Sequence, residues 1–144
     1  MYADLDDLKT LCGDEELIQL TDRADPPSGL IDEAVTAGAL TAAAHVIDGY
    51  VGAQYQLPLS SSVPLLIDLA CDIARYRLYK TAATDQVRQR YEDAIKMLVS
   101  ISKGVVKLPV ADEGSGSGEP AGRSDVMTIQ SEPRIFSRTS MRGL

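Results

Sequence analysis

The chain has 144 residues, 44% of them hydrophobic, and carries a formal net charge of −7. This length is enough for one domain with its own core, and no apolar run is long and uncharged enough to predict a membrane-spanning helix. The opening Met1–Leu5 has neither a basic region nor an apolar run, so we expect no signal peptide. The basic residues are few and scattered, which argues against a DNA-reading surface.

Two short amphipathic helices are predicted at the start of the chain. The first spans Ala3–Cys12, with Asp4 as its expected N-cap and Gly13 as its expected stop. The second follows at once, with Asp14 as its expected cap and further acidic residues in its first turn. The composition of Asp25–Gly29, two prolines and a glycine among polar residues, then predicts a loop.

A long helix is predicted from Ile31 to Tyr55. Apolar residues recur along it at helical spacing, and alanine dominates that face, so another helix can approach closely. We expect the buried stripe to consist of Ile31, Val35, Ala39, Ala42, Val46 and Tyr50, widened by Ala43 and Ile47.

The stretch Val63–Lys80 is predicted to be the central helix, because apolar residues appear on almost every side of it. Pro64 suits its first turn, where a missing N–H costs nothing. Leu69 and Ile73 are expected to be almost fully buried. Asp68, Asp72 and Arg75 share one stripe, where they predict a charge network inside the bundle or at a subunit contact.

A last long helix is predicted to run from Thr84 or Asp85 to Lys103, with Gly104 after its end. The short turn before it predicts antiparallel packing against the central helix. The predicted fold is therefore all-α: a small bundle of about five helices around a buried central helix, with an extended C-terminal arm.

The character of the chain changes after Gly104. We divide it into a helical bundle domain at 1–104, an extended segment and Gly/Ser-rich linker at 105–124, and a C-terminal anchoring arm at 125–144. Charge also divides along the chain, because the first 33 residues hold ten acidic and two basic side chains, whereas the last 25 hold four arginines. This separation favours complementary contacts between copies or with a partner, and a solvated acidic face is the alternative interpretation.

Sequence patterns for catalysis are absent. His45 is the only histidine, and it lies within a helix. Cys12 and Cys71 have no metal-type spacing and are predicted to be reduced thiols that pack as small hydrophobes. We therefore expect no enzyme activity, no catalytic residue, no cofactor and no metal.

The order of landmarks resembles the Mu-type phage and prophage family of head–tail connector proteins. The opening Met1–Leu8 is similar to the start of the sequences in that family. No single motif is specific to the family, but the series of motifs in this order is. The series continues with Ile47-Asp-Gly-Tyr-Val-Gly-Ala-Gln-Tyr-Gln-Leu-Pro-Leu59, Asp72-Ile-Ala-Arg-Tyr76, Arg90-Tyr-Glu-Asp-Ala-Ile-Lys96 and Arg134-Ile-Phe-Ser-Arg-Thr-Ser-Met-Arg-Gly-Leu144. Gln54 departs from the basic residue expected there.

The resemblance implies a structural virion protein that forms a ring below the portal, extends the DNA channel and provides the tail attachment surface. The implied partners are copies of itself, the portal protein, a tail-side connector or terminator protein, and passing DNA without sequence-specific contacts, with no membrane. The implied location is the head–tail junction of the virion, and the host cytoplasm during assembly. A stand-alone helical adaptor or regulatory protein is the alternative, and an uncharacterised enzyme or enzyme subunit is a third class.

The arm is predicted to bind the portal protein or a neighbouring subunit, because its apolar residues lie beyond a linker and cannot join the bundle. Val126–Gln130 suits an extended strand added to a sheet edge. For Arg134–Arg142, an extended segment and a short helix starting at Pro133 remain open. The predicted partner-binding residues are Val126, Ile129, Arg134, Ile135, Phe136, Arg138 and Arg142.

Overall fold

The computed structural model describes residues 1–79 and 81–110, which form five α-helices and no strand. The helices are α1 Leu5–Cys12, α2 Asp14–Thr21, α3 Glu33–Val51, α4 Pro64–Leu78 and α5 Asp85–Ser102. This confirms the predicted all-α bundle of about five helices. The Gly/Ser-rich linker and the predicted C-terminal arm lie outside the described residues.

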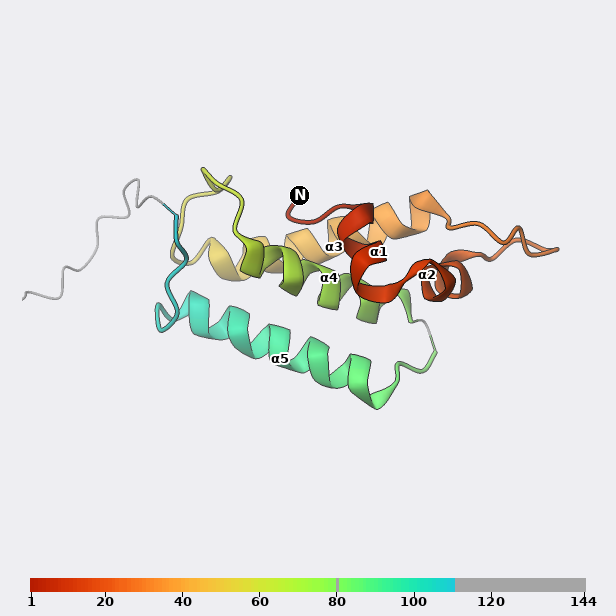
Figure 1. Cartoon of the computed structure of the whole chain (residues 1–144). Helices are drawn as coiled ribbons and strands as arrows, with labels where there is room; N and C mark the ends of the chain where they lie inside the picture. Colours follow the sequence, from red (N-terminus) through yellow and green to blue (C-terminus); the bar gives the residue numbers. More distant parts are fainter. Residues whose placement is uncertain (80, 111–144) are drawn as a thin grey trace, which may run out of the picture.

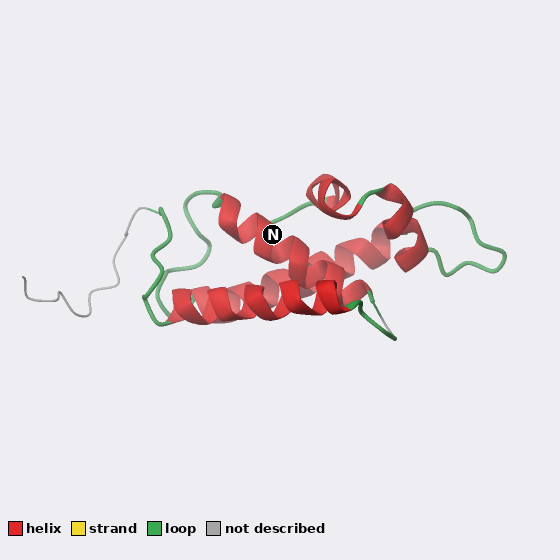
Figure 2. Cartoon of the chain, turned by 60° about the horizontal axis from the view of Figure 1, so that its bottom comes forward, coloured by secondary structure: helices red, strands yellow, loops and turns green. Residues whose placement is uncertain are grey.

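The three long helices lie alongside one another and alternate in direction, as Figure 1 shows. All three touch one another, and α4 also contacts α1. The short helices α1 and α2 pack beside one end of the long ones, and the loop between α2 and α3 extends beyond the bundle (Figures 1 and 2). The bundle is therefore organised around α4, as the sequence predicts.

Helix α4 is the most deeply buried element. Leu69 is 7% exposed and Ile73 is 0% exposed, which confirms the burial predicted for both. Pro64 occupies the first turn, as expected, and Val63 precedes it with an extended backbone. The helix ends at Leu78 instead of continuing to residue 80, because Tyr79 also adopts an extended backbone. The other buried residues of α4 are Leu66, Ala70, Cys71, Ala74 and Leu78.

Helix α3 is shorter than predicted at both ends. Asp32 is its N-cap, and one carboxylate oxygen accepts hydrogen bonds from the N–H groups of Ala34 and Val35 at 2.9 and 3.1 Å. The helix therefore begins at Glu33 and not at Ile31. It ends at Val51, where three turn residues replace the predicted last turn up to Tyr55.

The buried stripe predicted for α3 is confirmed at Ala43 and Ile47 and was wrong for its other members. The buried residues are Thr36, Leu40, Ala43, Ala44, Ile47 and Val51. Val35, Ala39, Ala42, Val46 and Tyr50, which the apolar pattern favours, are only half-buried at its edge. Thr36 accounts for part of the shift, because its hydroxyl donates within the helix to the carbonyls of Asp32 and Glu33 and can therefore be buried.

The short N-terminal helices are fixed by their caps. Asp4 is the N-cap of α1 and forms a capping box with Asp7, so the helix begins at Leu5 and not at Ala3. Gly13 ends α1 with φ of 83°, a conformation that favours glycine. Gly13 is also the residue before α2, and Asp14, predicted to cap α2, is instead its first residue.

Helix α5 begins after Thr84, whose hydroxyl accepts a hydrogen bond from the N–H of Val87 at 3.4 Å. It ends at Ser102, one residue before the predicted end, and Gly104 follows with φ of 71°. Leu108 packs into the core, and its N–H donates to the hydroxyl of Tyr55 at 2.8 Å. Packing therefore continues beyond the end of the last helix.

Candidate functional site

A charged cluster joins α4 to α2. Arg75 donates two hydrogen bonds of 2.8 Å, from Nε to Oε1 and from Nη2 to Oε2 of Glu16. The hydroxyl of Tyr79 donates to the same Oε1 at 2.9 Å. The hydrogen bonds to Glu16 raise the pKa of Arg75 above its ordinary value. Two parallel bonds between guanidinium and carboxylate fix orientation as well as adding energy, so this pair locks α2 against the central helix.

A second ion pair joins α4 to α5. Asp72 Oδ1 lies 3.2 Å from Nε of Arg90, and the Asp72 side chain is 15% exposed. That oxygen is buried, and its geometry toward Arg90 does not make a hydrogen bond. Burial therefore raises the pKa of Asp72, although Arg90 and Arg75 act in the opposite direction.

These two pairs confirm part of the prediction for the charged stripe of α4, because two of its three residues pair with side chains of neighbouring helices inside the bundle. Asp72 and Arg75 contribute to it, whereas Asp68 is exposed and takes no part in the pairs. Glu16 and Arg90 are the partners that sequence reasoning missed. Glu16 is separated from Arg75 by 59 residues, so helical spacing along one element carries no signal for the contact.

Among the described residues, His45 forms no hydrogen bond or ion pair with either cysteine considered for catalysis. His45 is exposed on α3. Cys71 is buried and Cys12 is half-buried, and neither forms a disulfide. Burial raises the pKa of Cys12 to about 11 and that of Cys71 to about 12. Both thiols therefore stay protonated near neutral pH, the opposite of what a nucleophilic cysteine requires.

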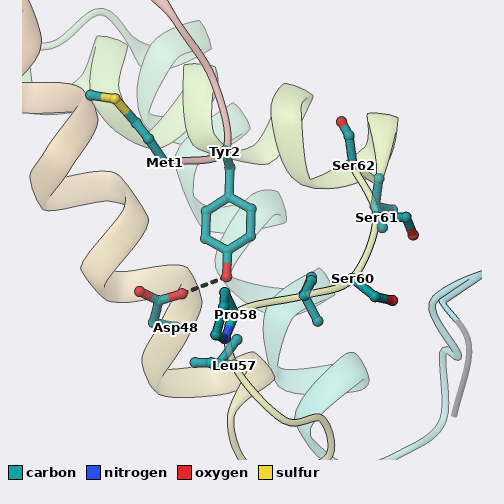
Figure 3. A pocket seen from close by; sticks show the side chains of 10 residues that line it. Met1, Tyr2, Asp48, Leu57, Pro58, Ser60, Ser61 and Ser62 are labelled. Atoms are coloured by element: carbon teal, nitrogen blue, oxygen red, sulfur yellow. Dashed lines mark hydrogen bonds between the residues drawn. The ribbon is translucent and has the colours of Figure 1, made fainter. Parts of the chain in front are cut away.

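The N-terminal segment closes over a cavity of about 570 Å³ between α3 and the loop before α4. Figure 3 shows the Tyr2 ring pointing to Asp48 of α3, and its hydroxyl donates a hydrogen bond to Oδ1 of Asp48. Leu57, Pro58 and Val63 contribute apolar walls. Burial and the Asp48 carboxylate raise the pKa of Tyr2, so the phenol remains a donor that ties the segment to α3.

The described part of the chain contains no group of three or more His, Cys, Asp or Glu side chains that could hold a metal ion. Within those same residues, no helix is long and apolar enough to cross a membrane. The predicted partner-binding residues Val126, Ile129, Arg134, Ile135, Phe136, Arg138 and Arg142 lie outside the described residues.

The fold and these contacts define a small all-α protein whose partly buried charged side chains join its helices. Comparison with known proteins gives its family. Residues 2–127 match the family model described as Bacteriophage Mu, Gp36, and the chain belongs to this family of Mu-type phage proteins.

Two relatives cover most of the chain. The Mu-like prophage FluMu protein gp36 of Haemophilus influenzae is 35% identical over 118 residues, which are 82% of this chain and 81% of the relative. Gene product J of Escherichia phage Mu is 33% identical over 137 residues, which are 95% of this chain and 94% of the relative. The resemblance to Mu-type phage proteins is therefore confirmed.

Proposed function

We propose that this protein is a structural component of the virion, a head–tail connector that forms a ring below the portal. The ring extends the DNA channel and offers an attachment surface to the tail. The observation that carries the proposal is membership of the Mu gp36 family over residues 2–127, together with the resemblance of its landmarks to head–tail connectors. The partners are copies of the chain, the portal protein and a tail-side connector or terminator protein.

The internal arrangement of the bundle supports an assembly role. Three contacts between partly buried polar side chains join parts of the fold: Glu16 binds Arg75, Asp72 pairs with Arg90, and Tyr2 of the N-terminal segment binds Asp48 of α3. Both thiols have raised pKa values, so they make poor nucleophiles. We propose accordingly that the protein catalyses no reaction and needs no cofactor. DNA passes through the ring without sequence-specific contacts.

The test is a Mu-like phage that lacks this chain. We expect DNA-filled heads and free tails that fail to join, and restoration of joined particles when the intact chain is supplied. Electron microscopy of complete particles should place the chain at the portal–tail junction with rotational symmetry. Normal yields of joined particles without the chain would contradict the proposal and favour the alternative of an adaptor or regulatory protein.

A further inference from the structure

A cavity of about 450 Å³ lies where the end of α4 meets the start of α5. Two arginines and three tyrosines, Tyr76, Arg77, Tyr79, Arg88 and Tyr91, line it together with the connecting loop. None of its described lining residues is acidic. In a chain with a net charge of −7, a concave surface of this composition is a local exception.

The two arginines are available to a ligand. Arg77 is exposed and has no ion pair within the described residues. Arg88 lies 3.7 Å from Asp85 in a pair whose side chains are both exposed, an arrangement that contributes little. Tyr76 and Tyr91 stack with ring centroids 4.2 Å apart and present aromatic surface beside them. The lining is mainly polar, with the tyrosine rings as part of its smaller apolar surface, so the cavity suits a carboxylate carried next to a small apolar group.

The loop between α2 and α3 projects from the bundle and presents one carboxylate, Asp25, next to two prolines, with Arg23 as the one cation among residues 23–30. Residues 23–30 are all exposed, and the loop extends beyond the helices in both views (Figures 1 and 2). It carries the sequence Asp25-Pro-Pro27, and Leu30 on it is 69% exposed. None of these residues lines the cavity of the same chain.

Hydrogen bonds hold this loop in shape. The Asp22 carboxylate accepts from the N–H groups of Gly29 at 2.6 Å and Ala24 at 3.2 Å. At the base, the Thr21 hydroxyl accepts from the N–H of Asp32 at 3.0 Å. A loop fixed in this way loses less conformational entropy when it binds.

We propose that the arginine–tyrosine cavity of one copy receives the 23–30 loop of a second copy. The Asp25 carboxylate pairs with the guanidinium groups of Arg77 and Arg88, and the two prolines pack against the tyrosine rings. Because the loop and the cavity are different surfaces, each copy can give its loop to one neighbour and receive the loop of another, which is the arrangement that closes a ring. The inference deepens the proposed connector ring and rests on it.

A second copy is a better occupant than DNA. The cavity offers two arginines on a molecule that is acidic overall, and the first 33 residues hold ten acidic side chains that would repel phosphate. DNA binding through this cavity is the competing outcome that the experiment must separate.

The experiment is a charge swap in the full-length chain. One variant is Arg77→Glu/Arg88→Glu, and the other is Asp25→Arg. Self-association is measured by sedimentation at low salt up to about 1 mM protein. Each variant alone should associate about tenfold or more weakly than the wild type, because like charges then meet. An equimolar mixture should recover association, since it contains both the original contact and the swapped one.

Two control variants carry the same changes in charge at other exposed positions. Lys103→Glu/Lys107→Glu matches the cavity variant at two exposed residues after the end of α5, and Asp68→Arg matches the loop variant on exposed α4 surface. Both controls should associate like the wild type. Circular dichroism verifies folding, and Arg77→Gln/Arg88→Gln repeats the test with a milder change if the reversed variant unfolds.

Three results would overturn the inference: no self-association of the wild type at the highest concentration, no effect of either swap, or no recovery in the mixture. Salt-sensitive DNA binding that disappears in the cavity variant while self-association persists would assign the cavity to phosphate instead. The connector role is tested separately, by the particles formed without the chain, so failure of this inference is distinguished from failure of the connector role.

Discussion

At Asp72, pairing with a cation does not fully offset the cost of burying the ionised carboxylate. It lies on the central helix, its Oδ1 is buried, and the nearest cation is Arg90 at 3.2 Å without a hydrogen bond. Burial raises its pKa, so the folded protein binds this proton more tightly than the unfolded chain does. The ionised carboxylate therefore costs the fold some stability, while its pairing with Arg90 recovers part of that cost.

This imbalance predicts a particular dependence of stability on pH. As pH rises from about 4, where an unfolded aspartate ionises, toward the raised pKa of Asp72, the folded state retains the proton and the free energy of unfolding falls. The Asp72→Asn variant has no ionisable group at this position, so its free energy of unfolding lacks this dependence on pH. The stability of the wild type minus that of Asp72→Asn should decrease through this range and then level off.

Chemical denaturation at a series of pH values measures the difference. Asp25→Asn, which removes an exposed carboxylate from the α2–α3 loop, is the control for the loss of one acid. A wild-type advantage that grows with pH through the same range would show that Arg90 more than compensates for the burial of Asp72.

Ile73 tests the packing around α4. Its side chain is fully buried, so replacement by Ala removes apolar contacts and leaves a cavity. Ile73→Ala should lower the free energy of unfolding by about 2–5 kcal/mol. Arg77→Ala, at an exposed position on the same helix, should change it by less than about 0.5 kcal/mol. A thermal melt unchanged by Ile73→Ala would mean that α4 is not the core of the bundle.

At the scale of the helices, sequence reasoning was most successful where the apolar pattern was unambiguous. Helix α4 has apolar residues on nearly all sides, so its central position followed from sequence alone. Helix α3 offered alanines on several sides, and small side chains do not distinguish the buried face from its edge. Thr36 is buried because its hydroxyl bonds to carbonyls of its own helix, a compensation that a hydrophobicity pattern does not register.

The charged contacts show the other limit of sequence reasoning. The stripe of α4 predicted that Asp72 and Arg75 would be engaged, because periodicity places them on one side of a buried helix. Their partners come from α2 and α5, and which residue of a distant helix meets them depends on how the helices pack. Glu15 and Glu16 are neighbouring residues of the same type, yet only Glu16 binds Arg75.

The different surroundings of Glu15 and Glu16 give a prediction about the stability of α2. The helix has eight residues and no side-chain cap, so it is too short to be stable without tertiary contacts. Glu16→Gln removes the charge of a bidentate pair and should destabilise the protein by about 1–3 kcal/mol. In the Glu16→Gln variant, the backbone amide hydrogens of α2 should exchange with solvent faster than in the wild type, while those of α4 and α5 keep their protection.

Glu15→Gln is the control, because Glu15 is exposed in the same turn and has the same chemistry. It should leave exchange in α2 nearly unchanged. Equal effects of the two variants would mean that the contribution of Glu16 comes from the helix dipole and not from Arg75.

At the scale of the whole molecule, the packing of the described residues reaches from the N-terminal segment to the residues that follow α5. Tyr2 closes over one end of α3, and Leu108 fills the core after the last helix. Among the described residues, the buried apolar residues of that core lie between residues 3 and 108. The segment from residue 125 onward follows a Gly/Ser-rich linker, and we expect it to serve assembly and to be dispensable for folding.

Deletion of Asp125–Leu144 tests this division of roles. We expect the shortened chain to keep its helical circular dichroism signal and a nearly unchanged melting temperature, because the Gly/Ser-rich linker separates the deleted segment from the helical bundle. In a phage that supplies only this variant, stable attachment of the connector to DNA-filled heads should be lost, since the arm carries the predicted partner-binding residues Ile135, Phe136 and Arg138. A variant of full length with the order of residues 125–144 scrambled controls for length and charge, and it should fail in the same way. Truncated protein that still joins heads to tails at the normal yield would refute the anchoring role, and a large fall in melting temperature would show instead that the segment belongs to the folded domain.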